Sequence, residues 1–331
     1  MPNTTTYGDI NQRTAGWAAN EMLKHAEPEL VLAKFGQTKP MPKNKAEKVK
    51  FRRPVPFGAA TTPLVEGVTP NAQKMAYEDV EVTLDQYGVP IEISDKVADL
   101  AEDPVLKDAS MLAGEQAALT VEMITYGAIK AGTNVYYANG TQRADVNTAI
   151  SLDKQRLVTR GLRAQKAAFI TNVLSGSTNY STKPIEQAYV AVAHTNLESD
   201  IRNMPGFIST ANYGSRQTLC AQEIGSVENV RYVLSSELDA WPNAGGLVNG
   251  MLSTGGANAD VYPVLYIGRD AYGLVPLKGM NAITPMVINP GTPSKSDPLG
   301  QRGYVSWKTY FAAVILNQNW MARLEVAATS L

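Results

Sequence analysis

Residues 103–132, DPVLKDASMLAGEQAALTVEMITYGAIKAG, form the stretch from which the fold of this chain can be read. Small and apolar residues recur in it at steps of three and four, the period of one helix face: Leu106, Ala109, Ala113, Ala117, Thr120, Ile124 and Ala128. Asp103 suits an N-cap, Pro104 suits the first turn, and Gly132 suits the position after the last turn. We expect a helix over 104–131, about 42 Å long, which is long for a globular domain.

A β-ribbon is predicted before this helix, at residues 49–94. Apolar side chains alternate with polar ones or proline on both segments: Val49, Phe51, Val55 and Phe57 on the outward one, and Val80, Val82 and Leu84 on the return. Pro54 and Pro56 cannot donate ladder hydrogen bonds, so the ribbon lies at an edge or stands free. The apolar parity changes after Gly88, which predicts a bulge or a change of strand partner. The Gly- and Thr-rich residues 58–76 form its loop tip. Because a two-stranded ribbon is marginal in water, we expect it to lie on a partner surface.

The segment before the ribbon, residues 1–48, is predicted to be an N-terminal arm. Residues 11–26 can form a helix, and a second short helix is expected from Pro28 to Gly36. The apolar content around them is thin, so the segment cannot bury a core of its own and must lie on something else.

Helix and strand alternate over residues 185–285, which predicts a compact α/β domain. Three buried strands are expected in it, at 189–193, 230–234 and 261–267. Thr195–Glu198 matches a capping box that starts a short helix. The stretch 243–260 contains five glycines and is expected to be a mobile loop.

The remaining segments are assigned to a peripheral domain. Residues 95–184 hold the long helix and a further helix expected from Asp153 to Ala168. Residues 286–331 are strand-like on both sides of a turn at 317–319 and are expected to return to the β-sheet of that domain. The predicted fold class is α+β.

Composition excludes several classes of protein. The chain has 331 residues, with 30 basic and 31 acidic side chains and a net charge of −1, so it lacks the basic excess of a dedicated nucleic-acid binder. Its one cysteine, Cys220, cannot form an intrachain disulfide, which fits a reducing cytoplasm. The N-terminus has no signal-peptide pattern, and no apolar run approaches the ~20 residues needed to cross a bilayer.

No residue pattern indicates catalysis. His25 and His194 have no second ligand at metal-binding spacing and are interpreted as structural. Cys220 has no base at fixed spacing and is interpreted as a small buried residue. Four acids are interpreted as surface or capping groups and not as a catalytic pair: Glu198, Asp200, Glu223 and Glu228. The glycines of 243–260 have no following lysine and form no phosphate loop. We expect no catalytic residue, no cofactor and no metal.

A cluster of cations lies on the ribbon and just before it, opposed in that stretch only by Glu47. Its members are Lys39, Lys43, Lys45, Lys48, Lys50, Arg52 and Arg53. Three interpretations are open: a solvated arm, contact with acidic surfaces on neighbouring subunits, and direct contact with DNA. The lack of interleaved aromatic residues disfavours DNA. Four of the cations are candidate intersubunit contacts: Lys48, Lys50, Arg52 and Arg53.

The order of arm, β-ribbon, long capped helix, α/β domain and returning β segment resembles the tailed-bacteriophage major capsid fold of the Hong Kong 97 type. In that family the parts are the N-arm, the extended loop, the spine helix of the peripheral domain, and the axial domain. The sequence is similar to one branch, the major capsid family named after coliphage N-four. Six stretches carry this resemblance: DINQRTAGWAANEMLK (9–24), VTLDQYGVPIEISD (82–95), YVAVAHTNLESD (189–200), EIGSVENVRYVL (223–234), VYPVLYIGRDAYG (261–273) and DPLGQRGYVSWKTYFAAVILNQNWMAR (297–323).

The resemblance implies a major capsid protein that assembles with copies of itself, as hexamers and pentamers, into an icosahedral shell enclosing phage double-stranded DNA. It implies portal, scaffolding and decoration proteins as partners, only non-specific contact with the packaged DNA, and no membrane. The protein would belong to the virion and assemble in the host bacterial cytoplasm. Because the arm follows directly on Met1, we expect any scaffold to be a separate protein.

Two other functions are open at this point. An encapsulin-like compartment shares the fold but would enclose an enzyme. An α/β enzyme with its site at 243–260 is disfavoured because the sequence shows no catalytic constellation.

Overall fold

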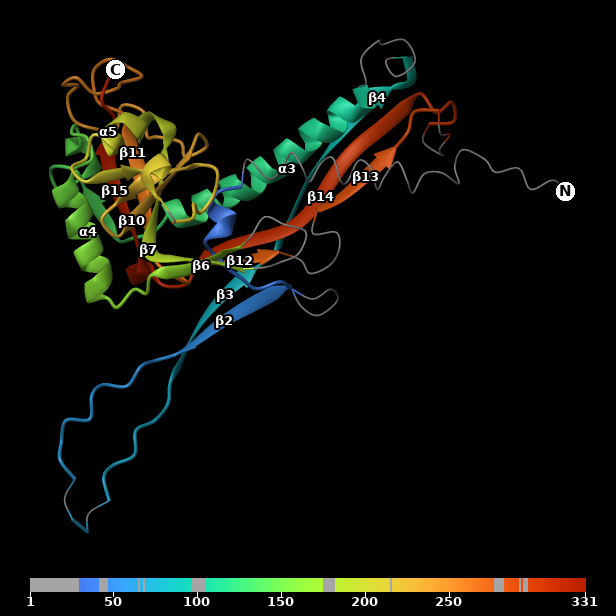
Figure 1. The fold of residues 1–331 in the computed structure, drawn as a ribbon. Helices are drawn as coiled ribbons and strands as arrows, with labels where there is room; N and C mark the ends of the chain where they lie inside the picture. Colours follow the sequence, from blue (N-terminus) through green and yellow to red (C-terminus); the bar gives the residue numbers. More distant parts are fainter. Residues whose placement is uncertain are drawn as a thin grey trace.

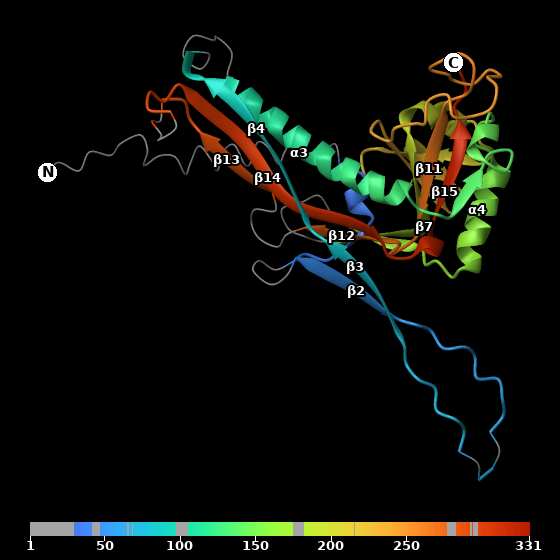
Figure 2. The same ribbon diagram turned by 180° about the vertical axis from the view of Figure 1, so that it is seen from behind.

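The computed structural model describes residues 30–41, 47–64, 66–67, 69–96, 105–174, 182–214, 216–276, 283–291, 293 and 297–331. A rounded domain stands at one end of an elongated body, and a straight extension of sheet and helix leads away from it (Figure 1). A thin β-ribbon projects from the body, as the view from behind also shows (Figure 2). Strands predominate over a few helices, which confirms the α+β class.

The rounded domain is built on an eight-stranded mixed sheet, ordered β5-β15-β11-β7-β10-β9-β8, with β6 paired to β7. Its strands are β5 (Val135–Tyr137), β6 (Ile170–Leu174), β7 (Thr182–His194), β8 (Phe207–Ser209), β9 (Glu223–Val227), β10 (Val230–Ser235), β11 (Val261–Ile267) and β15 (Met321–Ala327). β10 runs parallel to β7, whereas β11 is antiparallel to both β7 and β15. The three strands predicted in this domain are therefore confirmed.

Both faces of this sheet are covered. β10, β11 and β15 are buried along their whole length, which is why their sequences are continuous apolar runs. Helices α4 (Leu152–Ala164) and α5 (Glu198–Arg202) cover one face. The other face packs on Tyr126 and Ile129 at the end of the long helix. Short 3-10 helices lie in the connections: η2 (Leu32–Lys34), η3 (Arg143–Asp145), η4 (Thr195–Leu197), η5 (Thr210–Asn212) and η6 (Gln318–Trp320).

The extension consists of helix α3 (Val105–Lys130) on a five-stranded sheet. The helix matches the one expected over 104–131; its predicted cap, Asp103, lies outside the described residues. The strands are β1 (Gln37–Thr38), β4 (Asp85–Ser94), β12 (Tyr272–Pro276), β13 (Ile283–Ile288) and β14 (Arg302–Ile315). β14 pairs with β4 along one edge and with β13 and then β12 along the other.

Small side chains bring α3 close to this sheet. Val305 and Trp307 of β14 are buried against a row of alanines on the helix, namely Ala109, Ala113 and Ala117. The indole Nε1 of Trp307 donates to Gln116 Oε1 (3.1 Å), which fixes the helix along the sheet. The 3.6-residue period of the sequence therefore marks the face that packs on β14.

A two-stranded antiparallel ribbon, β2 (Lys48–Pro54) and β3 (Tyr77–Thr83), confirms the inner part of the predicted ribbon. The described residues of 55–76 continue from it and form its outer, projecting end (Figure 1). The predicted ribbon ran to residue 94, but the return strand pairs with β2 only over β3, and β4 pairs with β14 instead.

The change of strand partner predicted at Gly88 was placed wrongly. β4 pairs with β14 without interruption through Gly88, opposite Lys308, so the change falls at Leu84, between β3 and β4. Gly88 has another reason to be glycine. A Cβ there would lie 2.5 Å from the carbonyl oxygen of Trp307, so only glycine permits this approach of the two strands.

The segment 286–331 does not stay in one sheet. A turn was expected at 317–319, and η6 lies there, but the strands on its two sides do not pair with each other. β14 belongs to the five-stranded sheet, whereas β15 lies between β11 and β5 in the eight-stranded one. Complete burial of β15 explains the difference, because a strand buried on both faces requires an interior place.

Three helix predictions need correction. α4 runs from Leu152 to Ala164 with Ser151 as its N-cap, whereas a helix from Asp153 to Ala168 was expected. Over the described residues, the helix expected to end at Gly36 is only the single turn η2.

The third correction concerns the capping box expected at Thr195–Glu198. His194 supplies the cap instead, because its Nδ1 accepts from the Asn196 N–H (3.0 Å). Glu198 accepts from Arg202 Nε (2.8 Å), one turn farther along α5. A side chain one residue earlier thus takes the capping role.

Candidate assembly surfaces

The outer end of the ribbon carries apolar side chains that no part of the described chain covers. Every described residue of 55–76 is exposed, including Phe57 (56%), Leu64 (78%) and Met75 (59%). Exposed apolar side chains on a projecting segment make this segment a candidate contact surface for another protein. The sequence analysis treated 58–76 only as a small-residue loop; its scattered apolar residues were the signal for this surface.

Ion pairs join the two strands of the ribbon on its exposed surface. Arg52 donates from Nε and Nη2 to the two carboxylate oxygens of Asp79, at 2.7 and 2.8 Å. Arg53 donates from Nε and Nη2 to one oxygen of Glu78, at 2.9 and 2.6 Å. The strand register places each arginine directly opposite its acid, so the pairs fix the pairing of β2 with β3.

A third pair joins Lys50 to Glu81. Hydrogen bonding within it raises the pKa of Lys50 and lowers the pKa of Glu81. Hydrogen bonding to Arg52 likewise lowers the pKa of Asp79. Because all these groups are exposed to solvent, the pairs favour one strand register more than they stabilise the folded chain.

These contacts change the interpretation of the basic cluster. From the sequence, a solvated arm, contact with acidic surfaces on neighbouring subunits and contact with DNA were all open, and Glu47 was the only acid within that stretch. Glu78, Asp79 and Glu81 of the same chain face three of the cations, so a neighbouring subunit is not needed to supply the acids. The intersubunit role of Lys48, Lys50, Arg52 and Arg53 stays a prediction.

The other cations of the cluster lie apart from these pairs. Lys48 stands opposite Thr83 in the ribbon register. Lys39 donates from Nζ to the Lys50 carbonyl oxygen (2.6 Å), beside the ribbon. Lys43 and Lys45 lie outside the described residues.

The base of the ribbon is held firmly on the body. Its buried face packs with Val275 and Ala312 of the five-stranded sheet. The ring of Phe51 lies over Gly273, where a Cβ would come within 2.8 Å of it. Arg53 lies 5.8 Å from the centre of the Trp320 ring. The ribbon is therefore fixed in direction at its base, although its outer end has no support from the described chain.

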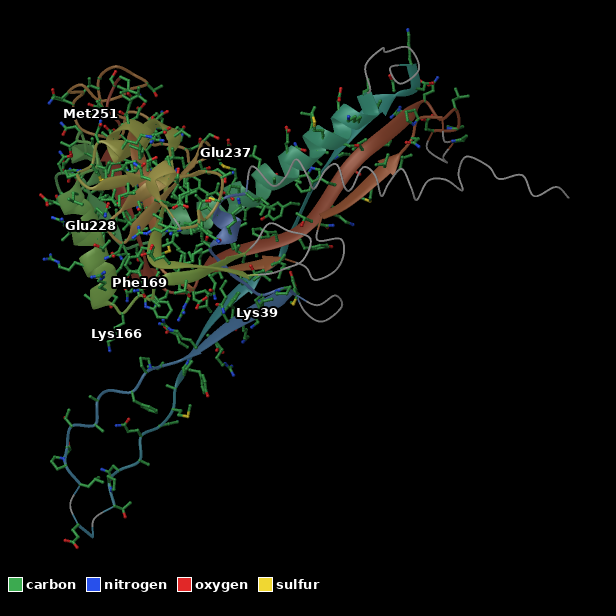
Figure 3. The ribbon with its side chains drawn as sticks, viewed as in Figure 1. Lys39, Lys166, Phe169, Glu228, Glu237 and Met251 are labelled. Atoms are coloured by element: carbon green, nitrogen blue, oxygen red, sulfur yellow. The ribbon has the colours of Figure 1, made fainter. Side chains whose placement is uncertain are left out.

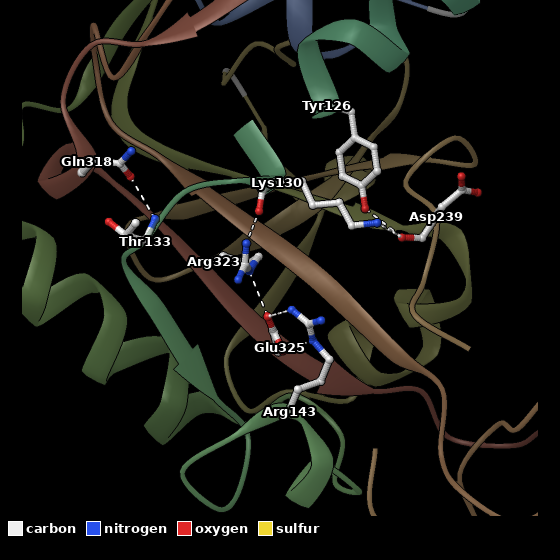
Figure 4. A network of polar contacts seen from close by, with 8 residues as sticks. All are labelled: Tyr126, Lys130, Thr133, Arg143, Asp239, Gln318, Arg323 and Glu325. Carbon is white, nitrogen blue, oxygen red and sulfur yellow. Dashed lines mark hydrogen bonds and ion pairs between the residues drawn. The ribbon is translucent and has the colours of Figure 1, made fainter. Parts of the chain in front are cut away.

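A buried polar network joins α3 to the rounded domain (Figure 4). Arg143 donates to both oxygens of Glu325, at 2.7 and 2.8 Å, and Arg323 Nε donates to the same carboxylate at 2.9 Å. Arg323 also donates to the carbonyl of Lys130, the last residue of α3. Glu325 is fully buried, so two arginines share one buried charge between β15 and the helix end.

The same junction continues on the other side of the helix end. Tyr126 Oη and Lys130 Nζ donate to the carbonyl oxygen of Asp239, at 2.7 and 3.2 Å. Burial lowers the pKa of Lys130 and raises that of Tyr126. The Thr133 N–H donates to Gln318 Oε1 (3.0 Å). These bonds connect structural elements to one another and make the junction stiff.

The candidates for chemistry are used in structural contacts. The described chain contains no group of three or more His, Cys, Asp or Glu side chains that could hold a metal ion. His194 caps η4, and burial raises the pKa of the Cys220 thiol, which makes it less reactive. His25 lies outside the described residues. The four acids of the sequence analysis are each held separately: Glu198 by Arg202, Asp200 by Thr329, Glu223 by Tyr213 and Glu228 by Arg156.

The glycine-rich stretch 243–260 is a hydrogen-bonded loop on the rounded domain, near Met251 in Figure 3. Asp260 accepts from the Asn243 N–H (2.8 Å) and from Thr254 Oγ1 (2.7 Å). The polar side chains of this stretch thus form hydrogen bonds within the loop itself. No helix of the described chain is long and apolar enough to cross a membrane.

The ribbon is anchored only at its base, and the polar groups considered above make contacts within the chain. These features are typical of a structural protein that assembles, and the comparison with known proteins supports the same class. Residues 77–325 match the phage capsid protein family, and the chain belongs to this family. A curated major capsid protein of Pseudomonas phage KPP21 is 23% identical over 270 residues, covering 75% of this chain and 68% of that protein.

Solved structures with the same fold are phage capsids. The capsid of Ralstonia phage GP4 superimposes with a TM-score of 0.64 at 14% identity, over 89% of this chain and 87% of that one. The capsid of cyanophage Pam1 gives 0.60 at 14% identity, over 93% of each. Membership of the phage capsid protein family identifies the chain as a structural protein of a phage virion and not an enzyme. The encapsulin-like and enzyme interpretations find no support.

Proposed function

We propose that this chain is the major capsid protein of its phage, and that hexamers and pentamers of it form an icosahedral shell around double-stranded DNA. The observation that carries the proposal is the uncovered segment 55–76. The exposed apolar side chains of this segment contribute no burial free energy in the monomer. Burying them on a neighbouring subunit would therefore favour association. Obligate interfaces of this kind bury roughly 2,000–5,000 Å².

We assign the parts of the chain by their resemblance to the Hong Kong 97-type fold and to the N-four branch. In this proposal residues 1–48 are the N-arm and 49–94 the extended loop. Residues 95–184 and 286–331 form the peripheral domain, with α3 as spine helix, and 185–285 form the axial domain. The division of the described strands between two sheets supports two such units, although β5, β6, β12 and β15 cross the proposed boundaries.

Partners other than the chain itself follow from the same resemblance. We propose a portal, a scaffolding protein, decoration proteins, and assembly in the host bacterial cytoplasm. Contact with DNA is proposed to be weak, non-specific and salt-dependent, because the net charge is −1 and three ribbon cations already face acids. A sequence-specific complex that survives high salt would contradict this.

Electron microscopy and sedimentation of the purified chain test the proposal. The wild type should form closed particles or rings. Replacing Phe57, Leu64 and Met75 together with serine should leave the chain folded and abolish particles. A matched control is Leu299→Ser, which changes an equally exposed leucine (77%) outside the ribbon and should assemble normally. A stable compact monomer of the wild type, or normal particles from the triple variant, would overturn the proposal.

A further inference from the structure

The carboxylate of Glu122 on the long helix is buried and holds a segment of the N-terminal arm, at Val31 and Leu32. The side chain is 1% exposed. Its Oε1 accepts from the Leu32 N–H at 2.9 Å, and its Oε2 accepts from the N–H groups of Leu32 and Val31, both at 3.2 Å. These amides begin η2, so a charged acceptor on α3 satisfies backbone donors that would otherwise be buried without a partner.

Other contacts hold the same segment. Tyr272 Oη, from β12, donates to the Leu32 carbonyl oxygen. The side chains of Leu32 and Phe35 fill the core between α3 and the two sheets. Residues 37–38 then pair with β12 as strand β1. Residues 31–38 are therefore wedged between the spine helix and the junction of the sheets, with Glu122 as the acceptor at the inner end.

We infer that Glu122 is a positioning residue that fixes where the N-terminal arm leaves α3, and that the proton on its carboxyl sets how firmly residues 31–35 are held. The inference rests on the proposed function only in calling 1–48 an assembly arm. Its consequence is that the arm is docked more firmly under mildly acidic conditions than at neutral or alkaline pH.

The direction of the pH effect follows from burial. Desolvation raises the pKa of Glu122 from 4.5 to about 7, and the hydrogen bonds from η2 oppose this only in part. If residues 31–35 detach, the carboxyl meets water and its pKa returns toward the ordinary value. The docked state therefore binds the extra proton. Docking is firmest below pH 4.5, weakens as pH rises through about 7, and is constant above that.

The size of the effect follows from the same two pKa values. They are about 2.5 pH units apart, so the equilibrium for detachment should rise by about 300-fold across this interval. The titratable side chains that face Glu122 from the packed elements are Lys34 on η2 and Tyr272 on β12. Burial raises the pKa of Tyr272 well above its ordinary value, so Tyr272 stays neutral throughout this range and Glu122 is the group that changes.

Hydrogen exchange of the purified chain, between pH 5 and pH 8 and corrected for intrinsic exchange, tests the inference. In the wild type, protection of amides 31–35 should fall with rising pH, whereas amides 261–267 of the core strand β11 serve as an internal reference. Glu122→Gln keeps an acceptor oxygen but cannot titrate, so its protection should not depend on pH. At pH 8 it should exceed that of the wild type. Glu115→Gln, two turns earlier on α3, is the matched control and should keep the wild-type profile.

Tyr272→Phe separates proton control from simple loss of a contact. It removes one bond to Leu32 and should lower protection at every pH, but it should keep the pH dependence. Equal pH dependence in the wild type and in Glu122→Gln would overturn the inference, as would a wild-type profile without pH dependence. Particle formation is scored separately by electron microscopy, so failure of the proposed function is told apart from failure of this inference.

Discussion

Strands β11 and β3 are each seven residues long, yet they serve opposite purposes. Every residue of β11 is buried between two neighbours in the rounded domain. No residue of β3 is fully buried; its single strand partner is β2, and the described residues of 55–76 that lead into it are exposed. The first strand obtains its stability inside the subunit. The second obtains less there. Val80 and Val82 pack on the body at the base of the ribbon, and Tyr77, at the outer end of the strand, is exposed.

The difference teaches that apolar residues of the same type contribute to two separate equilibria. In the rounded domain they favour folding of one chain. On the outer ribbon, in the described residues of 55–76, we expect them to favour association of chains and to leave folding almost unchanged. Variants that act on one equilibrium and not on the other therefore test this division directly.

The largest effect is expected in the core of the rounded domain. Leu265→Ala truncates a fully buried side chain of β11 and should lower the free energy of unfolding by about 2–5 kcal/mol. Leu64→Ala makes the same chemical change at a ribbon side chain that is 78% exposed, and should leave stability unchanged within about 0.5 kcal/mol. Urea unfolding of the unassembled chain measures both. If the two variants lost equal stability, the division between the regions would be wrong.

A smaller loss of stability is expected at β4, the strand that follows the ribbon and pairs with β14. Gly88→Ala places a Cβ 2.5 Å from a backbone oxygen of β14, so the two strands must move apart. We expect a loss of about 1–3 kcal/mol. Gly58→Ala, at a ribbon position with nothing within 4 Å, is the control and should cost less than about 0.5 kcal/mol. A Gly88→Ala variant as stable as Gly58→Ala would show that β4 is held loosely.

The elements that could be predicted from the sequence are those determined by residues close together in the chain. β10 and β11 were found because a strand buried on both faces is a continuous apolar run, and α3 because its small residues repeat at the helical period. The strands around 317–319 were expected in one sheet, because nothing local states that β15 pairs with β11. Strand partners depend on the whole fold, and an isolated segment does not reveal them.

The candidate surface shows the same limit. The cations of β2 were visible in the sequence, but their acids lie 25 and 27 residues away for Arg53 and Arg52. The register across the loop 55–76 decides which acid meets which cation, and loop length alone does not fix it. The cluster therefore looked unopposed. Glu122 left no signal at all, since a single glutamate in an apolar helix face reads as one more surface residue.

The smallest effect on stability is expected from the ribbon charges. Changing Lys48, Lys50, Arg52 and Arg53 together to serine should leave the unfolding midpoint and the circular dichroism unchanged, because the ion pairs are exposed. It should nevertheless impair shell formation in electron micrographs. The variant leaves Glu78, Asp79 and Glu81 unopposed, so the outer ribbon loses its fixed register and gains a surplus of negative charge. Normal shells at normal yield would show that the cluster is merely a solvated face.

A charge exchange decides which property of the ribbon matters. Arg52→Asp combined with Asp79→Arg keeps the pair between β2 and β3 but reverses its direction. If the pairs act by holding the strand register, the exchanged variant should assemble like the wild type, whereas Arg52→Asp alone should not. If Arg52 instead contacts an acid on a neighbouring subunit, both variants should fail.

Acidity provides an independent check on the same pairs. The pKa values of Asp79 and Glu81 are lowered by their basic partners, so the pairs contribute above the ordinary carboxyl pKa and are lost as pH falls through the lowered values. Ribbon amides 78–82 should therefore keep their exchange protection in mild acid and lose it only under stronger acid. Residues 31–35 should become better protected over the same mild range, because Glu122 takes up its proton there. Opposite responses of two segments in one chain cannot come from general loosening of the fold, so each response can be assigned to its own carboxylates.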